Sequence, residues 1–133
     1  MAKTERQKTI QRLDNLFSEY IRKRAYHEAS GCQRCKTGHS WDELQAAHCF
    51  TRGSYTTRWL PENALGICGG CHLYIDSHEG AKFALFREWV SPKDLEHLYV
   101  LAHMTSKASP VDYKMTEIYL KNSIKRLDGV LTF

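Results

Sequence analysis

No apolar run in this sequence approaches the roughly 20 residues that a membrane-spanning helix needs,. Basic residues near the start are not followed by the apolar segment of a signal peptide. The chain also lacks internal repeats, low-complexity tracts and long linkers, so its 133 residues fit one domain, 1–133,. We therefore expect a soluble cytoplasmic protein with no membrane partner.

Acidic residues do not balance the basic ones evenly along the chain. The formal net charge is +4, and residues 1–36 hold nine Lys and Arg against four Asp and Glu. This local excess favours a polyanionic partner such as DNA. A solvated basic face of a helix explains the charge equally well.

Hydrophobic periodicity predicts an α+β fold that is mainly helical outside a small core. Apolar residues recur at three- and four-residue steps over 4–28, which predicts a basic N-terminal helix within residues 1–30. Residues 79–90 also have a helical pattern. The start signal Ser91-Pro92 recurs as Ser109-Pro110 before residues 111–127,. The C-terminal segment, 79–133, is therefore predicted to be helical.

Residues 31–78 are predicted to form a core of two strands and a helix. Residues 44–50 alternate in polarity, residues 64–67 form a second strand, and a helix begins near Cys71,. One face of the first strand would consist of Leu44, Ala46, His48 and Phe50.

Two Cys-x-x-Cys pairs, Cys32/Cys35 and Cys68/Cys71, predict one structural zinc site,. In a reducing compartment such pairs bind metal far more often than they form disulfides. The 32 residues between the pairs must form a folded excursion whose ends meet at the Zn²⁺ ion. The fifth cysteine, Cys49, is interpreted as a small strand residue facing away from His48. Nucleobase deaminases are excluded, because no glutamate follows His48 in the position their chemistry needs.

The excursion contains His48 and Asn63, and His72 directly follows the second cysteine pair. Hydrolysis of a phosphodiester needs a general base, a divalent cation and groups that orient both, and these residue types can supply them. Each also has another interpretation. His48 can be a packed strand residue, Asn63 a turn residue, and His72 a zinc ligand in place of a cysteine. Their order between the cysteine pairs favours the catalytic interpretation of all three.

Three segments, together with a fourth that precedes them in the sequence, resemble a known family. They are Ala46-Ala47-His48-Cys49-Phe50, Thr57-Arg58-Trp59-Leu60-Pro61-Glu62-Asn63 and Cys68-Gly69-Gly70-Cys71-His72, preceded by Phe17-x-x-Tyr20-Ile21-Arg22-x-Arg24. Together they resemble the HNH endonucleases, most closely the small phage and prophage members that include nicking endonucleases and NinG-type recombination proteins. The similarity covers about residues 16–90. It implies DNA as the partner and the cytoplasm of a bacterial host as the location.

The resemblance implies a zinc-clamped ββα-metal core over residues 31–78. His48 would be the general base, Asn63 the orienting or metal-binding asparagine, and His72 the metal-side histidine. The catalytic cation would be Mg²⁺ or Mn²⁺, distinct from the structural Zn²⁺. Many members carry a metal ligand directly before the base, where this chain has Ala47. Asp76, one helical turn after His72, can supply the missing ligand.

Four arginines are candidate DNA contacts. Arg52 and Arg58 lie between the predicted strands, and guanidinium matches phosphate geometry, although both can equally be ordinary surface residues. Arg22 and Arg24 would contact the flanking backbone without reading sequence,. Trp59 is predicted to be a core residue.

Three functions remain open from the sequence. The first is a metal-dependent endonuclease that nicks DNA as a monomer, or cuts both strands as a homodimer. The second is a non-catalytic, zinc-stabilised nucleic-acid-binding module. The third is a zinc-stabilised protein-interaction domain, against which the basic N-terminal segment argues mildly.

Overall fold

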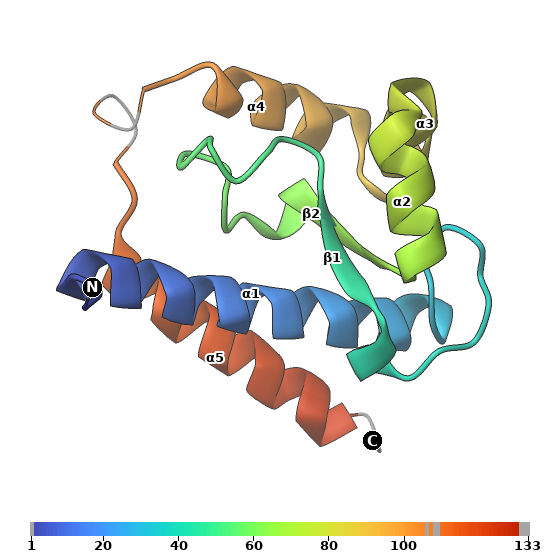
Figure 1. Cartoon of the computed structure of the whole chain (residues 1–133), viewed down its shortest axis with the longest axis horizontal. Helices are drawn as coiled ribbons and strands as arrows, with labels where there is room; N and C mark the ends of the chain where they lie inside the picture. The colour runs from blue at the N-terminus through green and yellow to red at the C-terminus, as the bar shows by residue number, and fades with distance from the viewer. Residues whose placement is uncertain (1, 106, 108–109, 131–133) are drawn as a thin grey trace.

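The computed structural model describes residues 2–105, 107 and 110–130. Helices dominate it, and the one sheet among the described residues has two strands (Figure 1). The elements in chain order are α1 (Glu5–Ala29), η1 (Trp41–Glu43), β1 (Gln45–His48), η2 (Pro61–Asn63), β2 (Ala64–Ile67), α2 (Gly69–Ser77), α3 (Glu79–Trp89), α4 (Pro92–Ala102) and α5 (Tyr113–Val130). The predicted α+β class, mainly helical, is therefore confirmed. Ser109 of the predicted Ser109-Pro110 start signal and residues 131–133 lie outside the described residues.

Helix α1 begins and ends at clear local signals. The Thr4 side chain accepts a hydrogen bond from the Gln7 backbone, and the Gln7 side chain accepts one from the Thr4 backbone, which forms a capping box,. Ser30 adopts a left-handed conformation that ends the helix,. The helix predicted over 4–28 is thereby confirmed. Its buried stripe consists of Leu13, Phe17, Ile21 and Ala25.

Strands β1 and β2 pair antiparallel, with Gln45 opposite Ile67 and His48 opposite Ala64. The first strand is shorter than the predicted 44–50, since the regular ladder ends at His48. Beyond it, the Cys49 backbone still donates to the Asn63 carbonyl at 2.7 Å before the chain leaves the sheet. His48 therefore lies at the end of the strand, beside a long loop.

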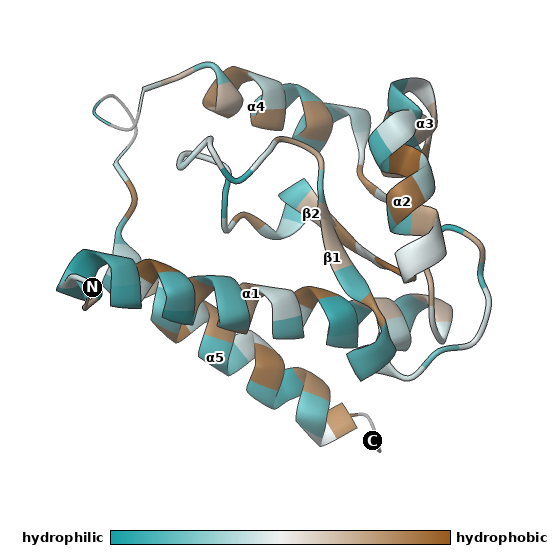
Figure 2. Ribbon diagram, viewed as in Figure 1, coloured by the Kyte–Doolittle hydropathy of each residue, from teal (hydrophilic) through white to brown (hydrophobic). Residues whose placement is uncertain are grey.

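Helix α1 lies between the sheet and α5 (Figure 1). Arg12 pairs with Glu117 near the start of both helices, and Lys23 pairs with Asp128 near their ends. The positions of these two ion pairs show that α1 and α5 run in the same direction. Figure 2 shows hydrophilic and hydrophobic residues interleaved along both helices, as expected of helices that each bury one face,.

The other part of the core joins the sheet to α2 and α3. Cys49 and Ile67 pack there with Ile75 of α2 and with Leu85 and Phe86 of α3. This packing fixes α2 relative to the end of β1. Within the described part of the chain, no helix is both long and apolar enough to cross a bilayer.

Candidate functional site

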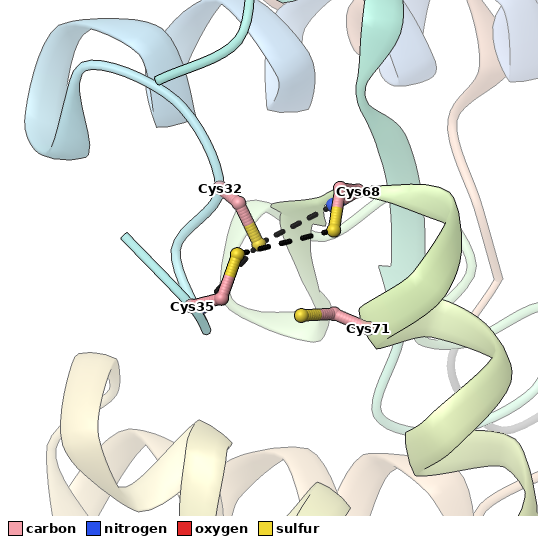
Figure 3. Close-up of side chains that lie close together, drawn as sticks. All are labelled: Cys32, Cys35, Cys68 and Cys71. Atoms are coloured by element: carbon pink, nitrogen blue, oxygen red, sulfur yellow. Dashed lines mark hydrogen bonds between the residues drawn. The ribbon is translucent and has the colours of Figure 1, made fainter. Parts of the chain in front are cut away.

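The two cysteine pairs meet at one point in the structure. Cys32 and Cys35 lie in the turn after α1, and Cys68 and Cys71 lie at the start of α2 (Figure 3). All four sulfur atoms are within 4.8 Å of one another. Four thiolates about 2.3 Å from a zinc ion would lie about 3.8 Å apart, so a modest contraction suffices. The prediction that the pairs form one site able to hold a metal such as Zn²⁺ is confirmed.

Gln33 brings the two pairs together. Its backbone N–H donates to the Gly66 carbonyl at 3.0 Å, and its side-chain oxygen accepts from the Gly66 N–H at 2.8 Å. The side chain is fully buried. The first turn is thus held against the outer edge of β2, directly before Cys68.

Hydrogen bonds connect the sulfur atoms of Cys32 and Cys35 to neighbouring groups. The backbone N–H groups of Cys35 and Cys68 donate to the Cys32 sulfur at 3.4 and 3.3 Å. A hydrogen bond with the Thr37 hydroxyl lowers the pKa of Cys35 to about 6. Burial raises the pKa of Cys71 to about 12, so this thiol needs a bound cation to ionise at neutral pH.

A second centre is a cleft of about 520 Å³, and none of the four cysteines lines it. Residues of α1, β1, the loop that follows β1, α2 and α3 line it. It brings together the predicted His48, His72 and Asp76. Its cationic side chains are Arg22, Arg52 and Lys82.

Burial determines the protonation of His48. It lowers the pKa of the imidazole to about 4, against a smaller opposing effect of a hydrogen bond with the Arg58 backbone. The ring of Phe17 lies 5.5 Å from the imidazole, centre to centre. His48 is therefore neutral at pH 7 and can accept a proton.

His72 and Asp76 lie one turn apart on α2, as predicted from their spacing. The His72 Nδ1 atom is 2.7 Å from the Gln45 side-chain oxygen, so we assign the ring proton to Nδ1,. Nε2 then carries a lone pair and lies 3.8 Å from the Asp76 Oδ1 atom. An imidazole nitrogen and a carboxylate oxygen at this spacing can both bind one divalent cation.

Asn63 has a different position from the one a cation ligand requires. Its side chain is fully buried and is not among the residues that line the cleft. The amide oxygen accepts from the Phe50 N–H at 2.9 Å, and the amide nitrogen donates to the carbonyls of Phe50 and Thr57, both at 3.0 Å. Both ends of this amide tie the loop after β1 to the sheet. These contacts fit the orienting role.

Of the four predicted DNA contacts, Arg22 and Arg52 lie in the cleft and two do not. Arg24 donates to the carbonyls of Pro61 and Ala64, at 3.0 and 2.7 Å. Arg58 is largely buried and forms a two-bond ion pair with Asp14 at 3.0 and 2.7 Å. Backbone carbonyls bind both Nη atoms of Arg24, and a carboxylate binds Arg58, so the structure holds both side chains against the protein and outside the lining of the cleft.

The prediction that Trp59 is a core residue is confirmed, and its Nε1 atom donates to Asp14 at 2.9 Å. Cys49 is buried in the core as well, and burial raises its pKa.

Sequence reasoning did not find Asp14, Gln45 or Lys82 as cleft residues. Nothing in their local patterns distinguishes them from other polar residues, since only the tertiary arrangement of α1, β1 and α3 places them beside His48.

Comparisons of the chain with protein-family models, curated proteins and solved structures find no match. The chemistry of the cleft and of the cysteine group is thus the basis for inferring a function.

Proposed function

We propose that the protein is a metal-dependent DNA endonuclease of the HNH kind, which hydrolyses phosphodiester bonds and nicks one strand. The observation that carries this proposal is the cleft, where neutral His48 lies with His72 and Asp76. Within the cleft, His48 lies at the end of β1, and His72 and Asp76 lie on α2. In the sequence, the first cysteine pair precedes His48 and the second pair directly precedes His72.

In this proposal His48 is the general base. Its buried, neutral imidazole accepts a proton from a water molecule as the water oxygen bonds to phosphorus, and the opposite P–O bond of the backbone breaks. The hydrogen bond with the Arg58 backbone holds the ring in one orientation. Asn63 keeps the adjoining loop, and so this end of β1, in place.

His72 and Asp76 would hold Mg²⁺ or Mn²⁺. The Nδ1 contact with Gln45 leaves Nε2 available, and the Asp76 carboxylate supplies the hard oxygen ligand that Ala47 cannot,. A bound divalent cation would supply charge stabilisation at the phosphate and at the departing oxygen. Arg52, which is mostly exposed in the cleft, would contact the same phosphate,.

A chain with one such cleft cleaves one DNA strand at a time, which favours nicking by a monomer. Cutting of both strands would need a homodimer or two successive events. The cations Arg22, Arg52 and Lys82 surround the cleft and suit the polyanionic DNA backbone,.

A plasmid assay tests the proposal. Supercoiled DNA is incubated with wild type, His48→Ala or His97→Ala, in Mg²⁺, Mn²⁺ or EDTA. His97→Ala is the matched control, because His97 is an exposed residue of α4 that does not line the cleft. Circular dichroism and zinc content are measured for all three proteins.

Open circles are expected with wild type and His97→Ala in either metal, and with neither protein in EDTA. His48→Ala should fold, retain zinc and leave the plasmid supercoiled. A shift of DNA mobility without nicking would support the non-catalytic binding module instead. No binding even at low salt would indicate the protein-interaction domain. Equal nicking by His48→Ala would contradict the role of His48 as the base.

A further inference from the structure

The carboxylate of Asp14 accepts hydrogen bonds from side chains of the loop that follows β1. Asp14 belongs to α1, outside the predicted core of residues 31–78. It accepts two hydrogen bonds from Arg58 and one from the Trp59 ring nitrogen. These donors lower the pKa of its carboxyl, although burial acts in the opposite direction. Asp14 is therefore ionised at neutral pH and also lines the cleft.

Arg52 is linked to this carboxylate at both of its ends. Its guanidinium Nη1 atom lies 3.8 Å from the Asp14 Oδ2 atom. Its backbone carbonyl accepts a hydrogen bond of 2.6 Å from the Arg58 Nη1 atom, and Arg58 is itself held by Asp14. One carboxylate thus fixes the backbone of Arg52 indirectly and its side chain directly.

The contact between Asp14 and Arg52 differs from the one between Asp14 and Arg58. The Arg58 side chain is only 12% exposed and makes two short bonds, whereas that of Arg52 is 63% exposed and has one longer contact. A weak, solvent-exposed ion pair costs little to exchange for a phosphate. Two arginines around one carboxylate also leave one positive charge in the cleft.

We propose that Asp14 is a positioning residue that holds Arg52 at the cleft. When DNA binds, the Arg52 guanidinium exchanges its contact with Asp14 for a contact with a phosphate. This inference rests on the proposed function. Asp14 does not touch the reacting atoms in this scheme and acts through Arg52. The carboxylate also lies close enough to His48 to affect it electrostatically, which places the whole assembly beside the base.

The alternative is that Asp14 only stabilises the fold through Arg58 and Trp59. The two possibilities differ in whether the effect of removing the charge depends on Arg52. A double-mutant cycle therefore separates them. It compares wild type, Asp14→Asn, Arg52→Ala and the double variant, with Asp94→Asn of α4 as an exposed carboxylate control. The measurements are kcat, KM and, in EDTA, the Kd for a short duplex.

Asp14→Asn should lower kcat by about tenfold to a hundredfold, the effect of misplacing a catalytic contact. Its Kd should fall on the order of threefold, because the Arg52 guanidinium is released from the carboxylate and becomes available to a phosphate. In the Arg52→Ala background, the same change should alter kcat by less than about twofold. A merely structural role predicts an equal loss of kcat in both backgrounds, and that result, or an unchanged kcat, would overturn the proposal.

Loss of the carboxylate can also unfold the protein, since it leaves Arg58 unpaired. In that case Arg58→Gln becomes the reference, because it removes the Arg58 charge and keeps the contact between Asp14 and Arg52. The double variant Asp14→Asn/Arg58→Gln is compared with it. The second variant should have the lower kcat. If wild type does not cleave DNA at all, the nuclease proposal fails, and the Kd cycle alone decides whether Asp14 restrains Arg52. In that cycle, a change in Kd that is independent of Arg52 argues against the restraint.

Discussion

The two histidines of the cleft are the same residue type with different chemistry. Burial keeps His48 neutral and lowers its pKa to about 4. His72 is partly exposed, and its contact with Gln45 assigns the proton to Nδ1. One ring is therefore unprotonated and available as a base at neutral pH, and the other can donate a lone pair to a cation. The surroundings of each residue, rather than its type, determine this division.

The lowered pKa of His48 predicts the pH dependence of cleavage. The base must be neutral, so activity should persist well below pH 6.5 and fall as the pH drops towards about 4,. Measured single-turnover rates between pH 4 and 8 test this, together with the NMR titration of the His48 ring. An acidic limb centred near pH 6.5 would contradict the burial of the ring.

The same shift affects stability with a definite sign. Between the ordinary histidine pKa of 6.5 and about 4, His48 takes up a proton in the unfolded chain but not in the folded one,. Its contribution to stability is therefore complete above pH 6.5 and is lost as the pH falls towards about 4. Urea unfolding of wild type and His48→Gln over this pH range measures the effect. The free energies of unfolding of the two proteins should approach each other as the pH falls.

Residue types and spacing alone were enough to predict the cysteine site. The same reasoning named His48, His72 and Asp76, which the structure brings to one cleft. It also predicted Asn63 as an orienting or metal-binding residue and Arg58 as a DNA contact, but it did not predict the contacts within the protein that hold both side chains. The partners of Asn63 are backbone groups of residues 50 and 57, and the partner of Arg58 is a carboxylate 44 residues earlier. Such partners depend on how the loop folds back, which no local pattern encodes.

Among the elements, α1 is the platform on which the cleft is built. It supplies Asp14 and Arg22 to the cleft, packs against β2, and carries α5 on another face. Its contact with the sheet is close at Gly66, where a Cβ atom would lie 2.5 Å from the Ala25 Cβ atom and 3.2 Å from the Ile21 carbonyl oxygen. The absence of a side chain at Gly66 therefore sets the distance between α1 and β2.

Gly66→Ala should destabilise the protein by about 1–3 kcal/mol, the usual cost of overpacking a core. Gly80→Ala in α3 is the matched control, because its Cβ would meet no atom within 4 Å. That change should be neutral or stabilise by about 0.5–1 kcal/mol through helix propensity. Urea unfolding measures both variants, and equal stabilities would show that α1 can move away from β2 at no cost.

Element types and most bounds follow from periodicity, as for the segments predicted over 4–28 and 64–67. The first strand was predicted as 44–50 and is Gln45–His48. The alternation of residue types continues past His48, but the backbone leaves the ladder to reach the loop that Asn63 anchors. Alternation describes side chains, whereas the end of a strand depends on where hydrogen bonding stops.

At the scale of the whole molecule, the cysteine group joins two segments that would otherwise be held by a small core. The segment after α1 and the start of α2 meet at the four sulfurs and at Gln33. Metal binding at such a site contributes free energy to folding directly. His48 and Asn63 lie on the chain between the two pairs, so their geometry depends on this closure.

We expect one zinc ion per chain and a large loss of stability when it is removed. Chelation or Cys68→Ser should lower the thermal midpoint strongly, since structural zinc contributes about 10 kcal/mol or more. Cys49→Ala is the control, because Cys49 is a core cysteine outside the group and its loss should leave the zinc content unchanged. Elemental analysis and thermal unfolding by circular dichroism are the measurements, and a midpoint insensitive to chelation would argue against a metal at this site.

The walls of the cleft come from positions as far apart in the chain as Asp14 and Lys82. A ribosome synthesises Asp14 and Arg22 first, His48 later, and His72 and Asp76 only after both strands are complete. A nascent chain thus carries the base for many elongation steps without the residues that face it. If the protein cuts DNA, an incomplete nascent chain cannot do so. Activity can begin only when the second cysteine pair and the helix that follows it have left the exit tunnel of the ribosome.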